Sequence, residues 1–257
     1  MIEARTPRKA KIARQVWQWT LSGINHLLWP PVCGNCNESI STADSDLCSK
    51  CWDQLLTCIA GEYCPRCGRD ASRYGLLAGA CPACQGQELH FDGIARAGVY
   101  ADALQHLILA FKHGRTELDA LLGRLAASAF AGSPFREQID LFVPVPLHWT
   151  RRLSRGYNQV YLLAKHVKSP GIRICTDLVR VRRTKAQPVA ATVAARARNV
   201  RNAFAVRPDH RFAGKTICLI DDIKTTGATL NECARTLKEA GAAHVHALVL
   251  AVAGQKQ

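Results

Sequence analysis

The 257-residue sequence has no apolar run of the roughly 18–20 residues that a membrane-spanning helix requires. It also lacks the pattern of a signal peptide, because polar residues interrupt the apolar part of its basic N-terminal segment and no small-residue cleavage site follows. Acidic residues are sparse, at 20 against 34 lysines and arginines, which gives a net charge of +14. We therefore expect a basic protein that spans no membrane and resides in the cytoplasm.

The few acids are unevenly distributed. Residues 148–173 contain six lysines and arginines and no acid, and residues 178–211 contain nine against Asp209 alone. Residues 33–92 have the opposite balance, with eight acids against four basic residues. Because proteins that grip nucleic acid by its phosphates need positive charge, we expect any such contact in the two basic segments.

Cysteine, in contrast, is abundant: there are twelve, and eight of them form four Cys-x-x-Cys pairs. Two residues between thiolates allow a tight turn to aim both sulfurs at one tetrahedral Zn²⁺. A disulfide framework is the alternative, but it needs an oxidising compartment that the missing export signal argues against. The pairs predict two structural zinc ions, bound by Cys33, Cys36, Cys48, Cys51, Cys64, Cys67, Cys81 and Cys84.

A sequential grouping of these ligands is preferred, with the first four on one ion and the last four on the other. The similar gaps between pairs leave a cross-braced arrangement open. Because the segment is acidic, we expect it to serve structure or protein binding. Cys58, Cys175, Cys218 and Cys233 have no partner at ligand spacing and are expected to be small apolar core residues.

One stretch near the C-terminus combines a strand, a small-residue loop and a helix. Residues 216–220 are apolar and largely β-branched, which predicts a buried strand of a parallel sheet with Asp221 and Asp222 at its end. The loop that follows is rich in hydroxyl groups, and a helical apolar pattern then runs to Gly241. The loop consists of Thr225, Thr226, Gly227, Ala228 and Thr229.

Such a loop is a candidate anion site, because the unpaired N–H groups and the dipole of a helix N-terminus favour negative charge. The paired carboxylates suit the vicinal hydroxyls of a sugar or a Mg²⁺ ion bound through water. Together they describe a site for a ribose 5-phosphate. The alternative is an ordinary strand–helix turn with two solvated aspartates.

Strand and helix patterns alternate along the second half of the chain, which predicts a parallel α/β sheet with ligands at the carboxyl ends of its strands. Strands are expected at residues 94–100 and 244–252, and residues 141–147 are expected to form a buried strand that runs into a proline-shaped loop. A helix is expected to turn Tyr157, Val160, Tyr161, Ala164 and Val167 inward. Residues 12–28 predict an amphipathic helix that packs on its own domain, with contact to anionic lipid as the alternative. We divide the chain into residues 1–31 (this helix), 32–91 (zinc segment) and 92–257 (α/β domain).

The sequence Asp-Asp-x-x-Thr-Thr-Gly-Ala-Thr resembles the phosphoribosyl pyrophosphate (PRPP) motif of type I phosphoribosyltransferases, although Lys224 stands where many members carry an aliphatic residue. Over nearly residues 27–252, the order of motifs resembles the ComF (competence protein F) family. These motifs are the four cysteine pairs, Phe-Lys-His-Gly114, Val-Pro-Val-Pro-Leu-His148, Arg-Gly-Tyr-Asn-Gln159, Arg-Thr-Lys-Ala-Gln187, Arg196-x-x-Asn-Val200, Ala-Phe204 and the PRPP motif.

The resemblance implies a type I phosphoribosyltransferase-like sheet with helices on both faces, preceded by a small Cys₄ zinc-ribbon module. It implies that Asp221 and Asp222 meet the ribose hydroxyls of PRPP with its Mg²⁺, and that Thr225 to Thr229 hold the 5-phosphate. Pro146, Leu147 and His148 take the place of the pyrophosphate loop, and Arg182, Arg183, Lys185 and Gln187 that of the flexible loop. For each arginine, a solvated basic surface is the alternative.

The resemblance also implies a role in natural transformation, in the uptake and handling of single-stranded DNA, with competence proteins as partners of the zinc module. One hypothesis is an enzyme that transfers phosphoribosyl to an unidentified nucleobase or amine. The other is a non-catalytic adaptor that binds PRPP or DNA. If DNA binds, its expected contacts are Arg182, Arg183, Arg196, Arg198 and Arg201.

Overall fold

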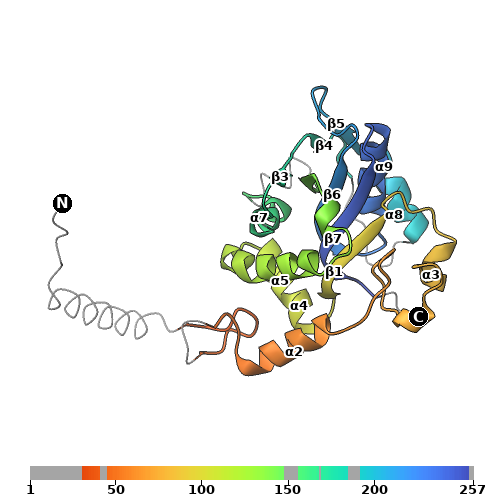
Figure 1. Cartoon of the computed structure of the whole chain (residues 1–257). Helices are drawn as coiled ribbons and strands as arrows, with labels where there is room; N and C mark the ends of the chain where they lie inside the picture. Colours follow the sequence, from red (N-terminus) through yellow and green to blue (C-terminus); the bar gives the residue numbers. More distant parts are fainter. Residues whose placement is uncertain (1–30, 41–44, 148–155, 168, 185–191, 255–257) are drawn as a thin grey trace, which may run out of the picture. The chain divides into compact units, whose positions relative to one another are not determined.

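The computed structural model describes residues 31–40, 45–147, 156–167, 169–184 and 192–254 (Figure 1). The expected N-terminal helix over residues 12–28 lies outside the described residues, as do His148, Lys185 and Gln187. The chain forms two compact units, Met1–Asp53 and Gln54–Gln257. The sequence-based division at residues 31 and 91 stays a prediction. No helix in the described part of the chain is long and apolar enough to cross a membrane.

The larger unit alternates strands and helices after a short cysteine-rich segment. Its elements are the end of α2 (Ser49–Ile59), η1 (Arg73–Gly75), α3 (Pro82–Gln85), β1 (Gly93–Val99), α4 (Asp102–Lys112), η2 (Thr116–Leu118), α5 (Asp119–Ala131), η3 (Arg136–Gln138), β2 (Leu141–Pro144), α7 (Gln159–His166), β3 (Arg173–Ile174), β4 (Leu178–Arg180), α8 (Val193–Val200), β5 (Phe204–Val206), β6 (Thr216–Lys224), α9 (Ala228–Glu239) and β7 (His244–Val252).

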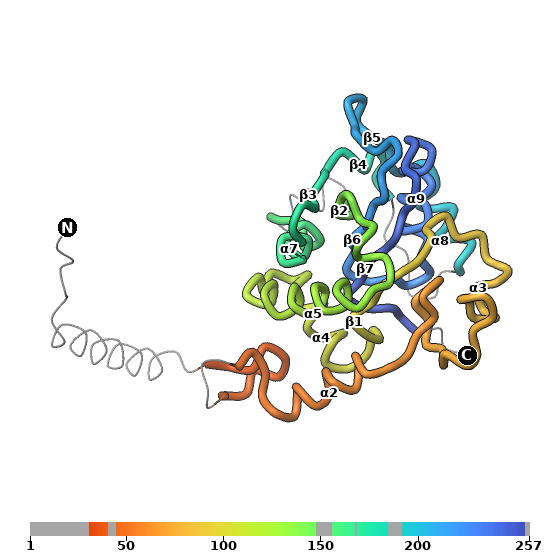
Figure 2. The backbone as a smooth tube through the Cα atoms, in the orientation of Figure 1, coloured from red at the N-terminus to blue at the C-terminus, as the bar shows by residue number. Residues whose placement is uncertain are grey.

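Five strands form one parallel sheet in the order β1-β7-β6-β2-β3, which confirms the predicted fold class (Figure 2). The central strands β6 and β7 are the longest, and their register pairs Thr216 with His244 and Lys224 with Val252. Strands β4 and β5 form a separate antiparallel pair. The strand predicted at residues 244–252 is confirmed, and the one at 94–100 agrees within one residue.

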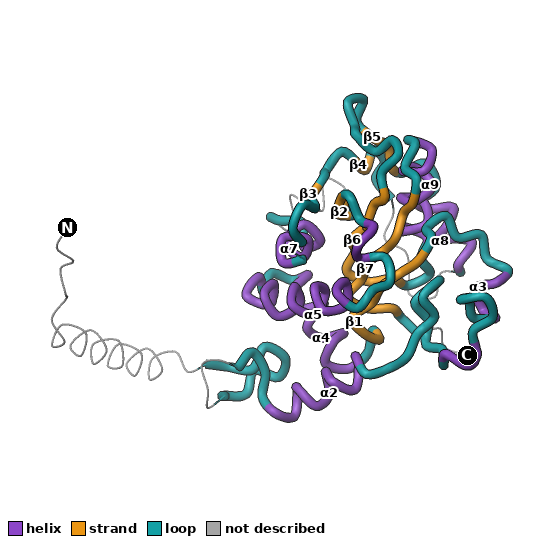
Figure 3. The backbone as a smooth tube through the Cα atoms, viewed as in Figure 1, coloured by secondary structure: helices purple, strands orange, loops and turns teal. Residues whose placement is uncertain are grey.

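Helices cover both faces of the sheet, because its strands carry buried residues on both faces (Figure 3). On one face, Ile217 and Leu219 of β6 pack in a core with Leu230 and Leu237 of α9. On the other, Phe142 of β2 meets the ring of Phe130 from α5 at a centroid distance of 5.1 Å. Buried Cys58, Cys218 and Cys233 agree with their predicted core role, whereas Cys175 is half-buried with its Sγ 3.1 Å from Asp177.

Two sequence-based expectations need correction. The helix predicted to turn five residues inward buries Val160, Ala164 and Val167 as expected, but it begins only at Gln159, so Tyr157 precedes it, and Tyr161 is 36% exposed. The strand predicted at residues 216–220 continues to Lys224. The longer strand matters for the site, because the acidic pair lies inside it rather than beyond its end.

The second cysteine group is bound directly to the sheet within the larger unit. Arg96 of β1 is 5% exposed, and its guanidinium donates to the carbonyl of Gly68 at 2.8 Å and to Asp70. Arg66 donates to the carbonyls of Leu89, at 2.8 Å, and of Phe91. These contacts make the segment around the second group an extension of the sheet domain.

Candidate functional site

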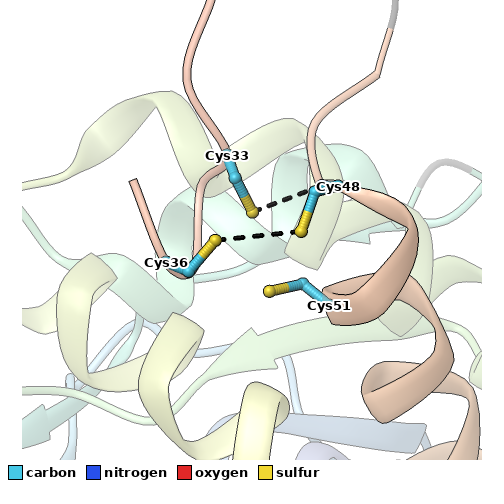
Figure 4. A group of neighbouring side chains, drawn as sticks. All are labelled: Cys33, Cys36, Cys48 and Cys51. Carbon is cyan, nitrogen blue, oxygen red and sulfur yellow. Dashed lines mark hydrogen bonds between the residues drawn. The ribbon is translucent and has the colours of Figure 1, made fainter. Parts of the chain in front are cut away.

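The structure gathers the eight paired cysteines into two clusters with the sequential grouping. Figure 4 shows the first cluster, whose sulfurs point toward one another from two turns and the start of α2. It consists of Cys33, Cys36, Cys48 and Cys51, and the second consists of Cys64, Cys67, Cys81 and Cys84. The described residues include all twelve cysteines, and none of them forms a disulfide bond.

The geometry of both clusters fits tetrahedral Zn²⁺. Sulfurs on one zinc at 2.3 Å would lie about 3.8 Å apart. The separations are 3.8 Å for Cys36–Cys48, 3.8 Å for Cys64–Cys84 and 3.6 Å for Cys67–Cys81.

Backbone donors favour a thiolate at one cysteine of each cluster, whereas burial and neighbouring cysteines raise the pKa of Cys36, Cys51, Cys67 and Cys84. Burial tends to raise the pKa of Cys33, but N–H groups of Cys36, Cys48 and Asn35 lower that pKa to about 6. Cys64 has the same kind of surroundings, and its pKa falls to about 7. When bound, zinc would tie the two turns of each cluster together and so serve the fold.

The threonine-rich loop lines a cavity of about 210 Å³ at the carboxyl end of β6. Gly227 precedes the 12-residue helix α9 with a φ of 84°, a left-handed conformation that suits glycine. A Cβ at this position would lie 2.9 Å from Cε of Lys224, so the close approach also needs glycine. All five predicted loop residues line this cavity, together with Asp221, Ile223, Arg180, Arg196 and others.

The two carboxylates of the acidic pair have different surroundings, because successive residues of a strand point to opposite faces. Asp221 lines the cavity, where burial first and then its neighbour Asp222 raise its pKa to about 7. Asp222 is not among the cavity residues; its Oδ1 lies 2.9 Å from Nζ of Lys112, at the end of α4.

Lys224 is 4% exposed, and its side chain lies against Gly227 beneath the loop. Burial lowers the pKa of its ammonium group. Among the described residues no carboxylate forms an ion pair with it. The neighbouring thiols of Cys67, Cys84 and Cys64 act in the opposite direction and raise that pKa, so Lys224 is a buried cation close to both the loop and the second cysteine cluster.

The predicted arginines are dispersed over this end of the molecule. Arg196 donates to the hydroxyl of Thr225 at 3.2 Å and so reaches the loop. Arg182 donates to the carbonyls of Asn199 and Arg201, at 3.0 and 2.6 Å, and thereby braces the end of α8. Arg183, Arg198 and Arg201 have exposed side chains.

The predicted pyrophosphate-loop residues Pro146 and Leu147 line a second cavity, of about 630 Å³, beside the first. Arg180 lines both cavities, and Tyr157 also borders the second. Sequence reasoning gave Lys112 and Arg180 no role. Lys112 lies in the Phe-Lys-His-Gly114 motif, which was the available signal for it.

The fold and this site define a phosphoribosyl transferase-type domain joined to a double zinc ribbon. The family described as phosphoribosyl transferase domain matches residues 116–257, more than half of the chain, and the double zinc ribbon domain matches residues 24–87. Among solved structures, the glutamine PRPP amidotransferase from B. subtilis is 22% identical, over 50% of this chain and 25% of that chain, with a TM-score of 0.32. A likeness this weak supports no argument of its own.

Relatives that match most of this chain identify its family. Competence protein F of Haemophilus influenzae is 32% identical over 226 residues, which cover 85% of this chain and 96% of that protein. The DNA utilization protein YhgH of Escherichia coli K12 is 30% identical over 84% of this chain and 94% of that protein, and competence protein ComFC of Bacillus subtilis is 28% identical over 78% and 81%. The chain belongs to the competence protein F (ComF) family.

Proposed function

We propose that the protein binds PRPP together with Mg²⁺ in the cavity before α9. The observation that carries this proposal is Lys224, a lysine more than nine-tenths buried beneath a glycine-bearing loop at a helix N-terminus. Backbone N–H groups of the first helical turn, a helix dipole and a buried ammonium all favour a phosphate there.

Each part of the ligand has proposed partners. The loop Thr225–Thr229 holds the 5-phosphate, with Arg196 bound to its first hydroxyl. Asp221 faces the cavity and meets the ribose hydroxyls or the Mg²⁺ ion. For Asp222, the predicted contact with the ribose competes with its ion pair to Lys112. The pyrophosphate is assigned to Pro146, Leu147, His148 and the flexible-loop residues Arg182, Arg183, Lys185 and Gln187.

The biological role that we propose is the handling of incoming single-stranded DNA during natural transformation in the cytoplasm. The names of the relatives support it, since they are a competence protein F, a ComFC and a DNA utilization protein. Competence proteins are the proposed partners of the zinc module. PRPP serves either as substrate of a phosphoribosyl transfer to a nucleobase or amine, or as the ligand of a non-catalytic adaptor.

Isothermal titration with PRPP and Mg²⁺ tests the binding. Thr226→Val, which removes one loop hydroxyl and keeps the side-chain volume, should weaken affinity about tenfold, as expected for a charge-assisted hydrogen bond. Thr192, which caps α8 and is not among the residues that line the cavity, provides the matched Thr192→Val control. Release of pyrophosphate with a panel of nucleobases and amines then separates transferase from adaptor. Absence of PRPP binding by the unaltered protein would refute the proposal.

A further inference from the structure

The end of helix α4 reaches the acidic pair from the face of β6 opposite the cavity. Lys112 is the last residue of α4, and its Nζ lies 2.9 Å from Oδ1 of Asp222. The two side chains are only 19% and 13% exposed. Because both are largely withdrawn from water, each depends on the other for compensation of its charge.

A second contact fixes where this lysine stands. The hydroxyl of Tyr157 donates to the carbonyl of Phe111, the residue before Lys112, and the two rings pack at a centroid distance of 6.0 Å. The chain then leaves the helix through Gly114 at a φ of 110°. Three sequence motifs thus meet: Tyr157 holds the end of α4, and α4 presents Lys112 to the strand that carries Asp222.

We propose that Lys112 is a positioning residue for the acidic pair. Its ammonium group neutralises Asp222 on one face of β6 and leaves Asp221 as the carboxylate presented to the ribose end of PRPP or its Mg²⁺. Two adjacent carboxylates without this cation would repel each other and an anionic ligand. This inference rests on the proposed function, but its first test does not require PRPP.

The first test measures the affinity of the protein for Mn²⁺ by electron paramagnetic resonance in the absence of PRPP. Mn²⁺ serves as a probe for Mg²⁺. Lys112→Met removes the cation beside Asp222, so a metal ion can bind there and the affinity for Mn²⁺ should rise at least fivefold. Lys112→Arg keeps a cation there, so its Mn²⁺ affinity should stay close to that of the unaltered protein. The double variant Lys112→Met/Asp222→Asn should lose the gain. Lys215→Met is the matched control, since it breaks a lysine–aspartate pair with Asp140 at the other end of the same strand.

The second test measures PRPP affinity in a double-mutant cycle. Lys112→Met should weaken binding about tenfold, because the uncompensated carboxylate of Asp222 repels the anionic ligand. Asp222→Asn should weaken it about tenfold too, because the largely buried ammonium of Lys112 loses the partner that holds it beside the site. The double variant should return to within about threefold of the unaltered protein. Direct contact of Asp222 with the ribose predicts instead that the double variant stays as weak as Asp222→Asn.

The outcomes separate the two proposals. Unchanged Mn²⁺ affinity in Lys112→Met, a gain that survives in the double variant, or a double variant as weak as Asp222→Asn would each overturn the positioning role. If the unaltered protein binds no PRPP but Lys112→Met gains Mn²⁺ through Asp222, the proposed function fails and the positioning role of Lys112 stands.

Discussion

At the scale of single residues, Asp221 and Asp222 show how neighbours in sequence acquire different chemistry. Strand geometry turns Asp222 toward Lys112 and Asp221 into the cavity. Because Asp221 is desolvated and has an anionic neighbour, its pKa rises to about 7. Its charge therefore changes within the physiological pH range, and the affinity for PRPP with Mg²⁺ should vary with pH over the same range.

We expect the affinity for PRPP with Mg²⁺ to increase from pH 6 to pH 8, because the proposed contact of Asp221 with the ribose hydroxyls or Mg²⁺ is strongest for its ionised carboxylate. Asp221→Asn should bind more weakly and lose the part of the pH dependence centred near pH 7. Titration calorimetry of both proteins checks this, since subtraction removes the ionisation of PRPP itself. Identical pH profiles would exclude Asp221 as the titrating group.

The raised pKa of Asp221 also affects stability. Between its ordinary value of 3.8 and about 7, the folded state holds more protons than the unfolded state, so this group's contribution to stability falls as the pH rises. The free energy of unfolding of Asp221→Asn should therefore fall less between pH 4 and pH 7 than that of the unaltered protein, as measured by urea denaturation. A pH profile that matches that of the unaltered protein would contradict this.

Lys224 leads to a separate expectation. Lys224→Met keeps the buried volume but removes the charge beneath the loop. Affinity for PRPP should fall about tenfold, the size expected for a lost charge-assisted contact. Lys215→Met serves as control, because Lys215 lies at the opposite end of β6. Equal affinities of Lys224→Met and the control would show that Lys224 does not serve the ligand.

At the scale of elements, the junction of β6 and α9 depends on one glycine. Gly227→Ala should cost roughly 1–2 kcal/mol for the left-handed conformation, and its Cβ would also displace Lys224. Gly214→Ala is the control, because Gly214 has a φ of 69° but open space around its Cβ position. Both variants should lose stability in denaturant unfolding, and only Gly227→Ala should lose PRPP affinity. Equal losses of affinity would point to a general loss of folding.

At the scale of the whole molecule, the two cysteine clusters belong to different compact units. The segment around the second one is joined to β1 through Arg96 and to the residues just before β1 through Arg66, so its metal should stabilise the phosphoribosyl transferase-type domain.

Metal analysis should find two zinc ions in the unaltered protein. It should find one in Cys36→Ala, which disrupts the first cluster, and one in Cys67→Ala, which disrupts the second. Cys67→Ala should lower the thermal midpoint of the larger unit and weaken PRPP binding, whereas Cys36→Ala should leave that midpoint unchanged. Calorimetry with zinc analysis checks both. Equal shifts of the midpoint would contradict the expected difference between the clusters.

The basic segments give the last prediction, which concerns single-stranded DNA. Arg183, Arg198 and Arg201 are exposed, whereas Arg182 and Arg196 also make contacts within the protein. Alanine at the three exposed positions should weaken binding of a labelled oligonucleotide. It should also flatten the logarithmic salt slope, by about 0.7 for each lost phosphate contact.

Fluorescence anisotropy measures this, with alanine at Arg73, Arg136 and Lys215 as the control of equal charge. If the control loses as much affinity as the test variant, only net charge matters and the assigned surface is wrong.

The sequence alone was sufficient for features that local pattern decides. Cysteine spacing predicted the two clusters, because two intervening residues restrict both thiolates to one turn. Alternating strand and helix patterns predicted the parallel sheet, and residues 225–229 marked the loop before α9 because small residues and a helix start are local signals. The family motifs supplied the rest of the expected site.

Only the tertiary structure decided which groups face one another. That Asp222 meets Lys112, 110 positions earlier, depends on how α4 packs beside β6 and on a strand that runs on to Lys224. That Arg182 braces α8 while Arg196 reaches Thr225 depends on the same kind of contact. No local pattern encodes such pairings, because the direction of a charged side chain is set by partners that the fold brings to it from distant parts of the chain.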